Sequence, residues 1–138
     1  MEAASKARKV LLIESEPVAS EVLQVLVDNL GCHGEVVPDG RQALATVRSE
    51  DFDAVLLDLR SSAMPPEDAV SGIRHIQPSL LGRVLVITGE VDDQATLDLV
   101  ERYLLLRIRR SRLKFGLAGR LRALLRITSL RSSSLTID

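Results

Sequence analysis

The sequence is poor in the residue types that build several kinds of functional site. Its 138 residues include one cysteine, Cys32, two histidines, His33 and His75, and three aromatic residues. A single cysteine excludes an internal disulfide and a cysteine-rich zinc site, and two scattered histidines exclude a histidine-based metal centre. Three aromatic residues are too few for the stacking surface of a protein that binds single-stranded nucleic acid.

Long apolar runs and nucleotide-binding glycine motifs are also missing. No apolar run approaches the roughly 18 residues of a transmembrane helix, and the first ten residues, MEAASKARKV, lack the apolar core of a secretory signal. The eight glycines form neither G-x-G-x-x-G nor G-x-x-x-x-G-K, so a dinucleotide-binding or P-loop function lacks its motif. These absences favour a cytoplasmic protein of one domain without membrane contact.

The charged residues are divided unevenly along the chain, although the net charge is only −1. Residues 1–102 carry 18 acidic and 9 basic side chains, whereas residues 103–138 carry 1 acidic and 9 basic side chains. The basic segment could contact the phosphates of nucleic acid or lipid. The favoured interpretation is that the basic segment forms a solvated helix face. A third interpretation is that it pairs with the acidic segment 92–101 of a second copy of the chain.

Hydrophobic periodicity predicts strands and helices in alternation. Three continuous apolar runs suit strands that are buried on both faces of a parallel sheet: KVLLIE (9–14), FDAVLLD (52–58) and RVLVIT (83–88). Two weaker strands are expected at 35–37 and 103–108, and apolar residues at helical spacing follow each strand. The pattern predicts an α/β fold of five βα units, with helices on both faces of a parallel sheet.

Polar side chains stand where these strands end: Glu14, Asp58, Thr88 and, after the fifth strand, Arg110. The carboxyl ends of parallel strands meet at one edge of the sheet, where α/β folds bind ligands, so we expect these side chains to lie together. Carboxylates there offer ligands to Mg²⁺, and an aspartate beside the ion can accept a phosphoryl group. The alternative is that each charged residue ends its strand only because the chain meets solvent there.

These segments resemble the receiver domains of response regulators in bacterial two-component signalling. VLLIESEP resembles the family's first strand with its acidic pair, FDAVLLDLR the strand with the phosphoacceptor, and VLVITGE the fourth strand with its switch hydroxyl. The offsets also match, at 44 residues from Glu14 to Asp58, 30 from there to Thr88 and 22 from there to Arg110. The TGE variant looks most like the receivers of hybrid histidine kinases.

The resemblance implies a flavodoxin-like (βα)5 fold and a signalling module that is not an enzyme. The receiver would span residues 9–127, between an N-terminal tail, 1–8, and a polar C-terminal tail, 128–138. Its partner would be a histidine kinase or a phosphotransfer protein, and a homodimer could form through the fourth helix, fifth strand and fifth helix. The resemblance does not favour nucleic acid as a partner.

The resemblance also implies a role for each residue of the site. Asp58 would accept the phosphoryl group, and Thr88 and Arg110 would bind its oxygens. A weakly bound Mg²⁺ would be held by Glu14, Asp58 and the backbone carbonyl of Arg60.

The sequence departs from the family at the site itself. Ser15 stands where the family has its second acid, so Ser15 or Glu16 would have to supply the missing metal ligand, and losing a carboxylate weakens Mg²⁺ binding. The family's lysine is Arg110, which is not interchangeable with lysine at a tight site, and the proline after it is Ser111. Lys114 becomes an alternative cation if the segment holds an insertion. Two functions stay open: a phosphoacceptor receiver, and a degenerate receiver that binds proteins without phosphorylation.

Overall fold

In a computed structural model of the chain, strands and helices alternate along the sequence. The structure describes residues 7–61, 63–91 and 93–137, with side chains as far as Leu125. The strands are β1 (Lys9–Ile13), β2 (His33–Val37), β3 (Ala54–Asp58), β4 (Val84–Thr88) and β5 (Leu106–Arg109). The α-helices are α1 (Pro17–Asp28), α2 (Gly40–Ser49), α3 (Pro66–Ile76), α4 (Gln94–Tyr103) and α5 (Leu113–Ile137). Short 3-10 turns are η2 (Pro78–Leu80) and η3 (Arg110–Arg112).

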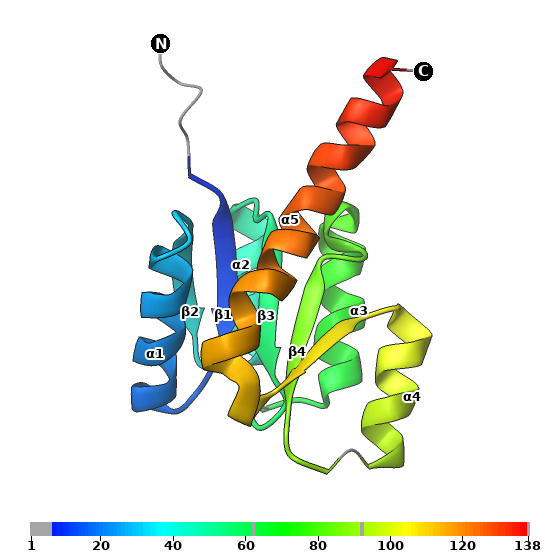
Figure 1. The fold of residues 1–138 in the computed structure, drawn as a ribbon. Helices are drawn as coiled ribbons and strands as arrows, with labels where there is room; N and C mark the ends of the chain where they lie inside the picture. The colour runs from blue at the N-terminus through cyan, green and yellow to red at the C-terminus, as the bar shows by residue number, and fades with distance from the viewer. Residues whose placement is uncertain (1–6, 62, 92, 138) are drawn as a thin grey trace.

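The five strands form one parallel sheet in the order β2-β1-β3-β4-β5 (Figure 1). This order confirms the predicted flavodoxin-like α/β sandwich. The chain moves outward from β1 to β2 and then returns past β1 to β3, so the order reverses between β1 and β3. A reversal of this kind opens a crevice at the carboxyl ends of the strands, which places the ligand-binding edge beside β1 and β3.

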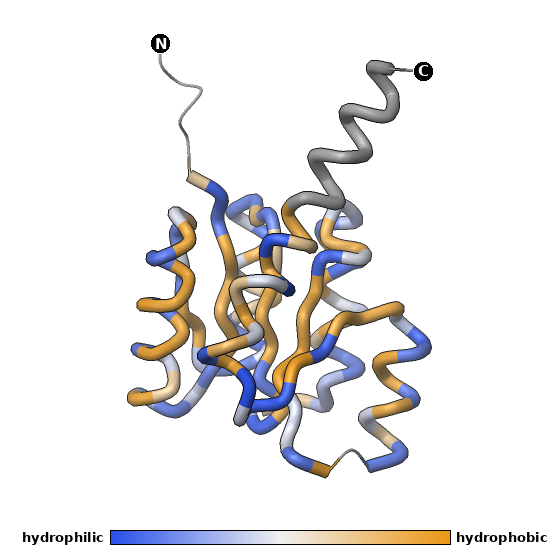
Figure 2. The backbone as a smooth tube through the Cα atoms, viewed as in Figure 1, coloured by the Kyte–Doolittle hydropathy of each residue, from blue (hydrophilic) through white to orange (hydrophobic). Residues whose placement is uncertain are grey.

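Side chains of the strands alternate between two apolar layers, one on each face of the sheet. In β1, Val10 and Leu12 pack with α1 and α5, whereas Leu11 and Ile13 pack with α2, α3 and α4. All four are fully buried, and burial of each such side chain contributes about 1.5–3 kcal/mol. In Figure 2 the strands β1, β3 and β4 are largely apolar through the centre of the fold.

The fifth strand begins at Leu106, later than the sequence predicts. Helix α4 continues to Tyr103, and Leu104 ends it with a φ of 54°. This left-handed conformation is more usual for glycine at a helix end, so an apolar side chain at that position gives no signal of the helix stop. After α1, by contrast, the left-handed residue is a glycine, since Gly31 has a φ of 79°.

The two predicted tails are only partly described. Residues 1–6 of the N-terminal tail lie outside the described residues, and α5 as described runs to Ile137, through most of the polar segment 128–138. Within the described ranges, no helix is both long and apolar enough to cross a membrane.

Candidate functional site

The carboxyl edge of the sheet brings the predicted polar side chains together. Asp58 and Thr88 are the last residues of β3 and β4, and Glu14 directly follows β1. All three are buried, with exposed fractions of 1%, 2% and 3% for Asp58, Thr88 and Glu14. Arg109 pairs with Thr88 across β4 and β5, so the chain delivers Arg110 to the same edge.

Asp58 is held by two arginines. Its Oδ1 accepts a hydrogen bond from Nη2 of Arg110 at 2.8 Å and another from the backbone N–H of Arg60, also at 2.8 Å. The Arg60 guanidinium adds two longer contacts, at 3.5 Å to Oδ1 and 3.4 Å to Oδ2. The Arg60 side chain is 56% exposed and that of Arg110 only 26%. Solvent therefore screens the Arg60 contact, and the bond to Arg110 is the stronger one.

These contacts keep Asp58 ionised. Its burial acts to raise the pKa of the carboxyl, but hydrogen bonds from Glu14, the Arg60 backbone, Arg110 and the Arg60 side chain outweigh burial and leave the pKa of Asp58 below its usual range. The negative charge of Asp58 is thus balanced inside the protein by guanidinium groups.

Ser61 links the neighbouring Glu14 to the loop after β3, and the sequence did not point to it. This side chain is 2% exposed. Its hydroxyl lies 3.3 Å from Oε2 of Glu14 and 3.2 Å from Oγ of Ser15, and it accepts a hydrogen bond of 2.8 Å from the backbone N–H of Ser15. Ser15 therefore contributes an amide and a hydroxyl at the position where the receiver family has a carboxylate.

Glu16 does not replace that carboxylate. It is the N-cap of α1, and its side chain accepts hydrogen bonds from the backbone N–H groups of Val18 at 3.1 Å and Ala19 at 2.8 Å. A carboxylate at a helix N-terminus satisfies free N–H groups and interacts favourably with the helix dipole. The capping contacts direct the Glu16 carboxylate toward α1 and away from Asp58.

The donor set at this edge does not fit a magnesium ion. Glu14 and Asp58 are the only carboxylates that the described residues bring together here, and in the described ranges no three His, Cys, Asp or Glu side chains form a metal-binding group. Mg²⁺ takes six oxygen ligands in a strict octahedral arrangement, of which the protein often supplies only one or two carboxylates and water the others, so the positive side chains at this edge matter more than the number of carboxylates. Two guanidinium groups already contact the Asp58 carboxylate, and their positive charges oppose a dication at the same place.

The pKa of Glu14 leads to a pH-dependent prediction. Burial, followed by the hydrogen bond with Asp58, raises this pKa above its ordinary value of 4.5. As the pH rises from 4.5, the unfolded chain releases the Glu14 proton before the folded chain does. The free energy of unfolding therefore falls with rising pH until the pKa of Glu14 in the folded state is passed, and the full loss persists at higher pH. Asp58 does not mask the effect, because its lowered pKa places its titration below this range.

We expect Glu14→Gln to remove that loss. The unfolding free energy of the variant should exceed that of the wild type at pH 7, and the difference should shrink as the pH is lowered toward 4.5. Urea unfolding between these two pH values measures the difference, with the exposed Glu21→Gln as the control for loss of one charge. A variant less stable than the wild type across this range would show that Glu14 is ionised and stabilising in the folded protein.

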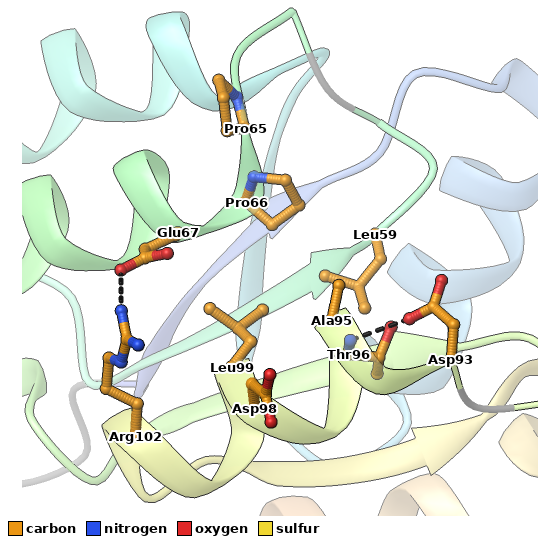
Figure 3. Close-up of a pocket in the computed structure, with 10 residues that line it drawn as sticks. All are labelled: Leu59, Pro65, Pro66, Glu67, Asp93, Ala95, Thr96, Asp98, Leu99 and Arg102. Atoms are coloured by element: carbon orange, nitrogen blue, oxygen red, sulfur yellow. Dashed lines mark hydrogen bonds and ion pairs between the residues drawn. The ribbon is translucent and has the colours of Figure 1, made fainter.

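A hollow of about 500 Å³ lies beside this edge, between α4 and the start of α3 (Figure 3). Its charged side chains bond to one another or to their own helix. Arg102 bonds to Glu67 at 2.5 Å, and the Asp93 side chain accepts the backbone N–H of Thr96 at 2.8 Å. The Tyr103 hydroxyl also donates to Glu67, at 3.2 Å. These contacts hold α4 against α3 and leave no group of polar side chains directed at a ligand.

Comparison with known proteins agrees with the resemblance seen in the sequence. Residues 10–104 match the model of the response regulator receiver domain. A response regulator receiver protein of Anaeromyxobacter sp. (strain Fw109-5) is 31% identical over 88 residues, which cover 64% of this chain and 36% of the relative. The sensor histidine kinase GacS of Pseudomonas protegens is 27% identical over 85 residues, 62% of this chain and 9% of the kinase. The chain thus corresponds to a minor part of these relatives.

Solved structures share the fold. The receiver domain of the sensor histidine kinase PA1611 of Pseudomonas aeruginosa has a TM-score of 0.73 and 22% identity, over 88% of this chain and 97% of that domain. That crystal structure holds a magnesium ion in its active-site cleft. The likeness extends to the arrangement of strands and helices, whereas the metal belongs to the relative.

Proposed function

The chain belongs to the response regulator receiver domain family, whose members are non-catalytic signalling modules, and we propose that it is a degenerate receiver that binds partner proteins without phosphorylation. The observation that carries this proposal is the pair of arginine contacts on Asp58. The family's reaction needs a metal ion beside the aspartate and a carboxylate oxygen that is free to attack phosphorus. Here the two arginines contact that carboxylate instead.

The charge of the site supports the proposal. Asp58 contacts the guanidinium groups of both Arg60 and Arg110, and Glu14 is the second carboxyl group at this edge. The hydroxyl of Ser15 adds no charge. A phosphoacceptor site needs surplus negative charge to attract a metal ion, and this edge is close to neutral.

The bond between Asp58 and Arg110 also has a structural effect. It ties the end of β3 to the turn η3 that follows β5. Receivers signal by changing the surface around the fourth and fifth elements, and a permanent ion pair at this point would hold that surface in one arrangement. We infer that partner proteins read this fixed arrangement.

The proposed partner is a histidine kinase or a phosphotransfer protein, met in the cytoplasm. Receiver domains as a family partner histidine kinases, and α1 offers a surface for such a contact. Val18 and Val25 of α1 are 65% and 57% exposed, and Val22, on the same face of the helix, is 37% exposed. A homodimer through α4, β5 and α5 remains a prediction.

One observation favours the second candidate, phosphoryl transfer to Asp58. Nε of Arg110 is buried and has no hydrogen-bond partner in the described part of the chain, and the Thr88 hydroxyl donates to the Gly89 carbonyl at 3.3 Å. A phosphoryl group on Asp58 would bring oxygen acceptors to both donors. In that reaction an Asp58 oxygen forms a bond to phosphorus while the bond from phosphorus to the donor histidine breaks.

Labelling with a small phosphodonor separates the two candidates. We expect no mass increase when the wild-type chain is incubated with acetyl phosphate and millimolar Mg²⁺, because the arginines occupy the Asp58 carboxylate. Intact-protein mass spectrometry measures the result. Stoichiometric labelling of the wild type that disappears in Asp58→Asn would establish the phosphoacceptor function instead.

A matched variant controls for the donor and the conditions. Ser15→Asp combined with Arg110→Lys restores the family's residue types at both positions, and we expect this double variant to gain Mg²⁺-dependent labelling. The single change Ser15→Asp should give less labelling, because Arg110 would still contact Asp58.

A further inference from the structure

A second pocket, of about 500 Å³, lies between β5 and the start of α5. Arginines dominate its lining, which consists of Arg107, Ile108, Arg109, Arg112, Phe115, Gly116 and Arg120. No acidic residue is among these lining residues. Arg112 and Arg120 give the pocket a positive potential, which attracts an anion. The pocket thus gives part of the basic segment 103–138 a specific location.

Arg120 is fixed in position at this pocket. Its Nε donates to the backbone carbonyl of Arg107 at 2.9 Å, and its Nη1 donates to the carbonyl of Gly116 at 3.4 Å. A guanidinium that is already ordered loses less conformational entropy when a ligand binds. The remaining N–H groups of Arg120 can donate to phosphate oxygens in the forked arrangement that arginine favours.

Gly116 makes room for this arrangement. Glycine inside a helix costs about 1 kcal/mol relative to alanine, and at position 116 it leaves a space that a Cβ would occupy. A Cβ at position 116 would lie 2.6 Å from Nη1 of Arg120 and 3.1 Å from Cδ1 of Ile108. Alanine there would therefore push the guanidinium away. At Gly119, in the same helix, a Cβ would have no heavy atom within 4 Å.

The remaining features indicate the class of ligand. Phe115 is 87% exposed, and its ring offers a flat apolar surface on which a planar ring can stack. The volume falls within the range of about 300–1,000 Å³ that is usual for small-molecule sites. We propose that this pocket binds a nucleotide, with the phosphates on Arg112 and Arg120 and the base on Phe115. None of the lining residues contacts Asp58, so the inference stands apart from the proposed function.

Binding of fluorescently labelled ATP, followed by anisotropy and competed with unlabelled ATP, tests the inference. We expect saturable binding by the wild type, and Arg120→Gln and Gly116→Ala should each weaken it by about tenfold or more. Phe115→Ala should weaken competition by ATP but leave competition by inorganic tripolyphosphate unchanged. Circular dichroism establishes that each variant is folded.

Two matched controls keep the result specific. Gly119→Ala makes the same chemical change in α5 without touching Arg120, and Arg48→Gln removes one exposed positive charge from α2, on the other face of the sheet. Both should bind ATP within about twofold of the wild type. The inference is overturned by three outcomes: no saturable binding at millimolar ATP, equal weakening by Arg48→Gln and Arg120→Gln, or equal affinities of the two glycine variants.

Discussion

Replacing Asp58 by asparagine is expected to lower the free energy of unfolding by about 2 kcal/mol at pH 7, because two guanidinium groups lose their charged partner. The pKa of Asp58 lies below its ordinary value of 3.8 because its hydrogen bonds outweigh its burial. Its ionised form therefore favours the folded state. This contribution is fully present above pH 3.8 and disappears as the pH falls through the pKa in the folded protein. The difference between wild type and variant should narrow in the same range.

The expected loss of stability distinguishes this site from one in which several carboxylates repel one another. In a site crowded with acids, the same substitution removes repulsion and stabilises the fold. A double-mutant cycle of Asp58→Asn and Arg110→Gln, measured by urea unfolding, should give a coupling of about 1–2 kcal/mol. Arg60→Gln is the control and should change stability by less than about 1 kcal/mol, because that side chain is 56% exposed. An Asp58→Asn variant as stable as the wild type would mean that the ion pair does not stabilise the folded state.

Replacing Gln77 by alanine is expected to lower the free energy of unfolding by about 3 kcal/mol, more than the change at Asp58. Gln77 follows α3 and is 8% exposed. Its Nε2 donates to the carbonyls of Val47, at 2.8 Å, and Glu50, and its Oε1 accepts the backbone N–H of Phe52 at 3.2 Å. Gln77→Ala leaves these three backbone groups without their partner, each of them at the end of α2 or in the segment leading into β3.

Two further variants test this interpretation. Gln77→Glu keeps the acceptor for Phe52 but sets a carboxylate against two carbonyls, so its stability should recover as the pH is lowered and the carboxyl gains a proton. The exposed Gln42→Ala serves as the control and should stay within about 0.5 kcal/mol of the wild type. Chemical unfolding measures all three variants. A Gln77→Ala variant as stable as this control would show that water replaces the lost hydrogen bonds.

The sequence predicted the fold and the meeting of Glu14, Asp58 and Arg110 for a simple reason. Continuous apolar runs mark the buried strands, and all parallel strands end at the same edge of the sheet. The start of β5 was harder to predict from the sequence. Residues 103–106, YLLL, carry no charged side chain that would mark a boundary. The left-handed φ that ends α4 belongs to a leucine, a residue type that does not signal a helix stop.

The hydrogen-bond partners of most polar side chains could not be predicted from the sequence, because they lie far apart along the chain. Ser61 bonds to residues that lie 46 and 47 positions away, and Gln77 bonds to backbone groups that are 25 to 30 positions away. The sequence offered Glu16 only as a possible metal ligand, and the structure identifies it as the N-cap of α1. For Arg60 the resemblance implied a role for the backbone carbonyl, which stays a prediction; the contacts of its backbone N–H and guanidinium with Asp58 were not predicted.

The position of β5 at the edge of the sheet has a consequence for local unfolding. The strand is the last in the order, next to β4, and only Ile108 of its residues is buried. Opening of β5 should therefore cost less free energy than opening of β1 or β3, which are paired on both sides and buried. A ligand that binds only the closed strand suppresses such opening by mass action. A ligand in the pocket between β5 and α5 would then make opening of β5 rarer, and β5 leads directly to Arg110 and its bond with Asp58.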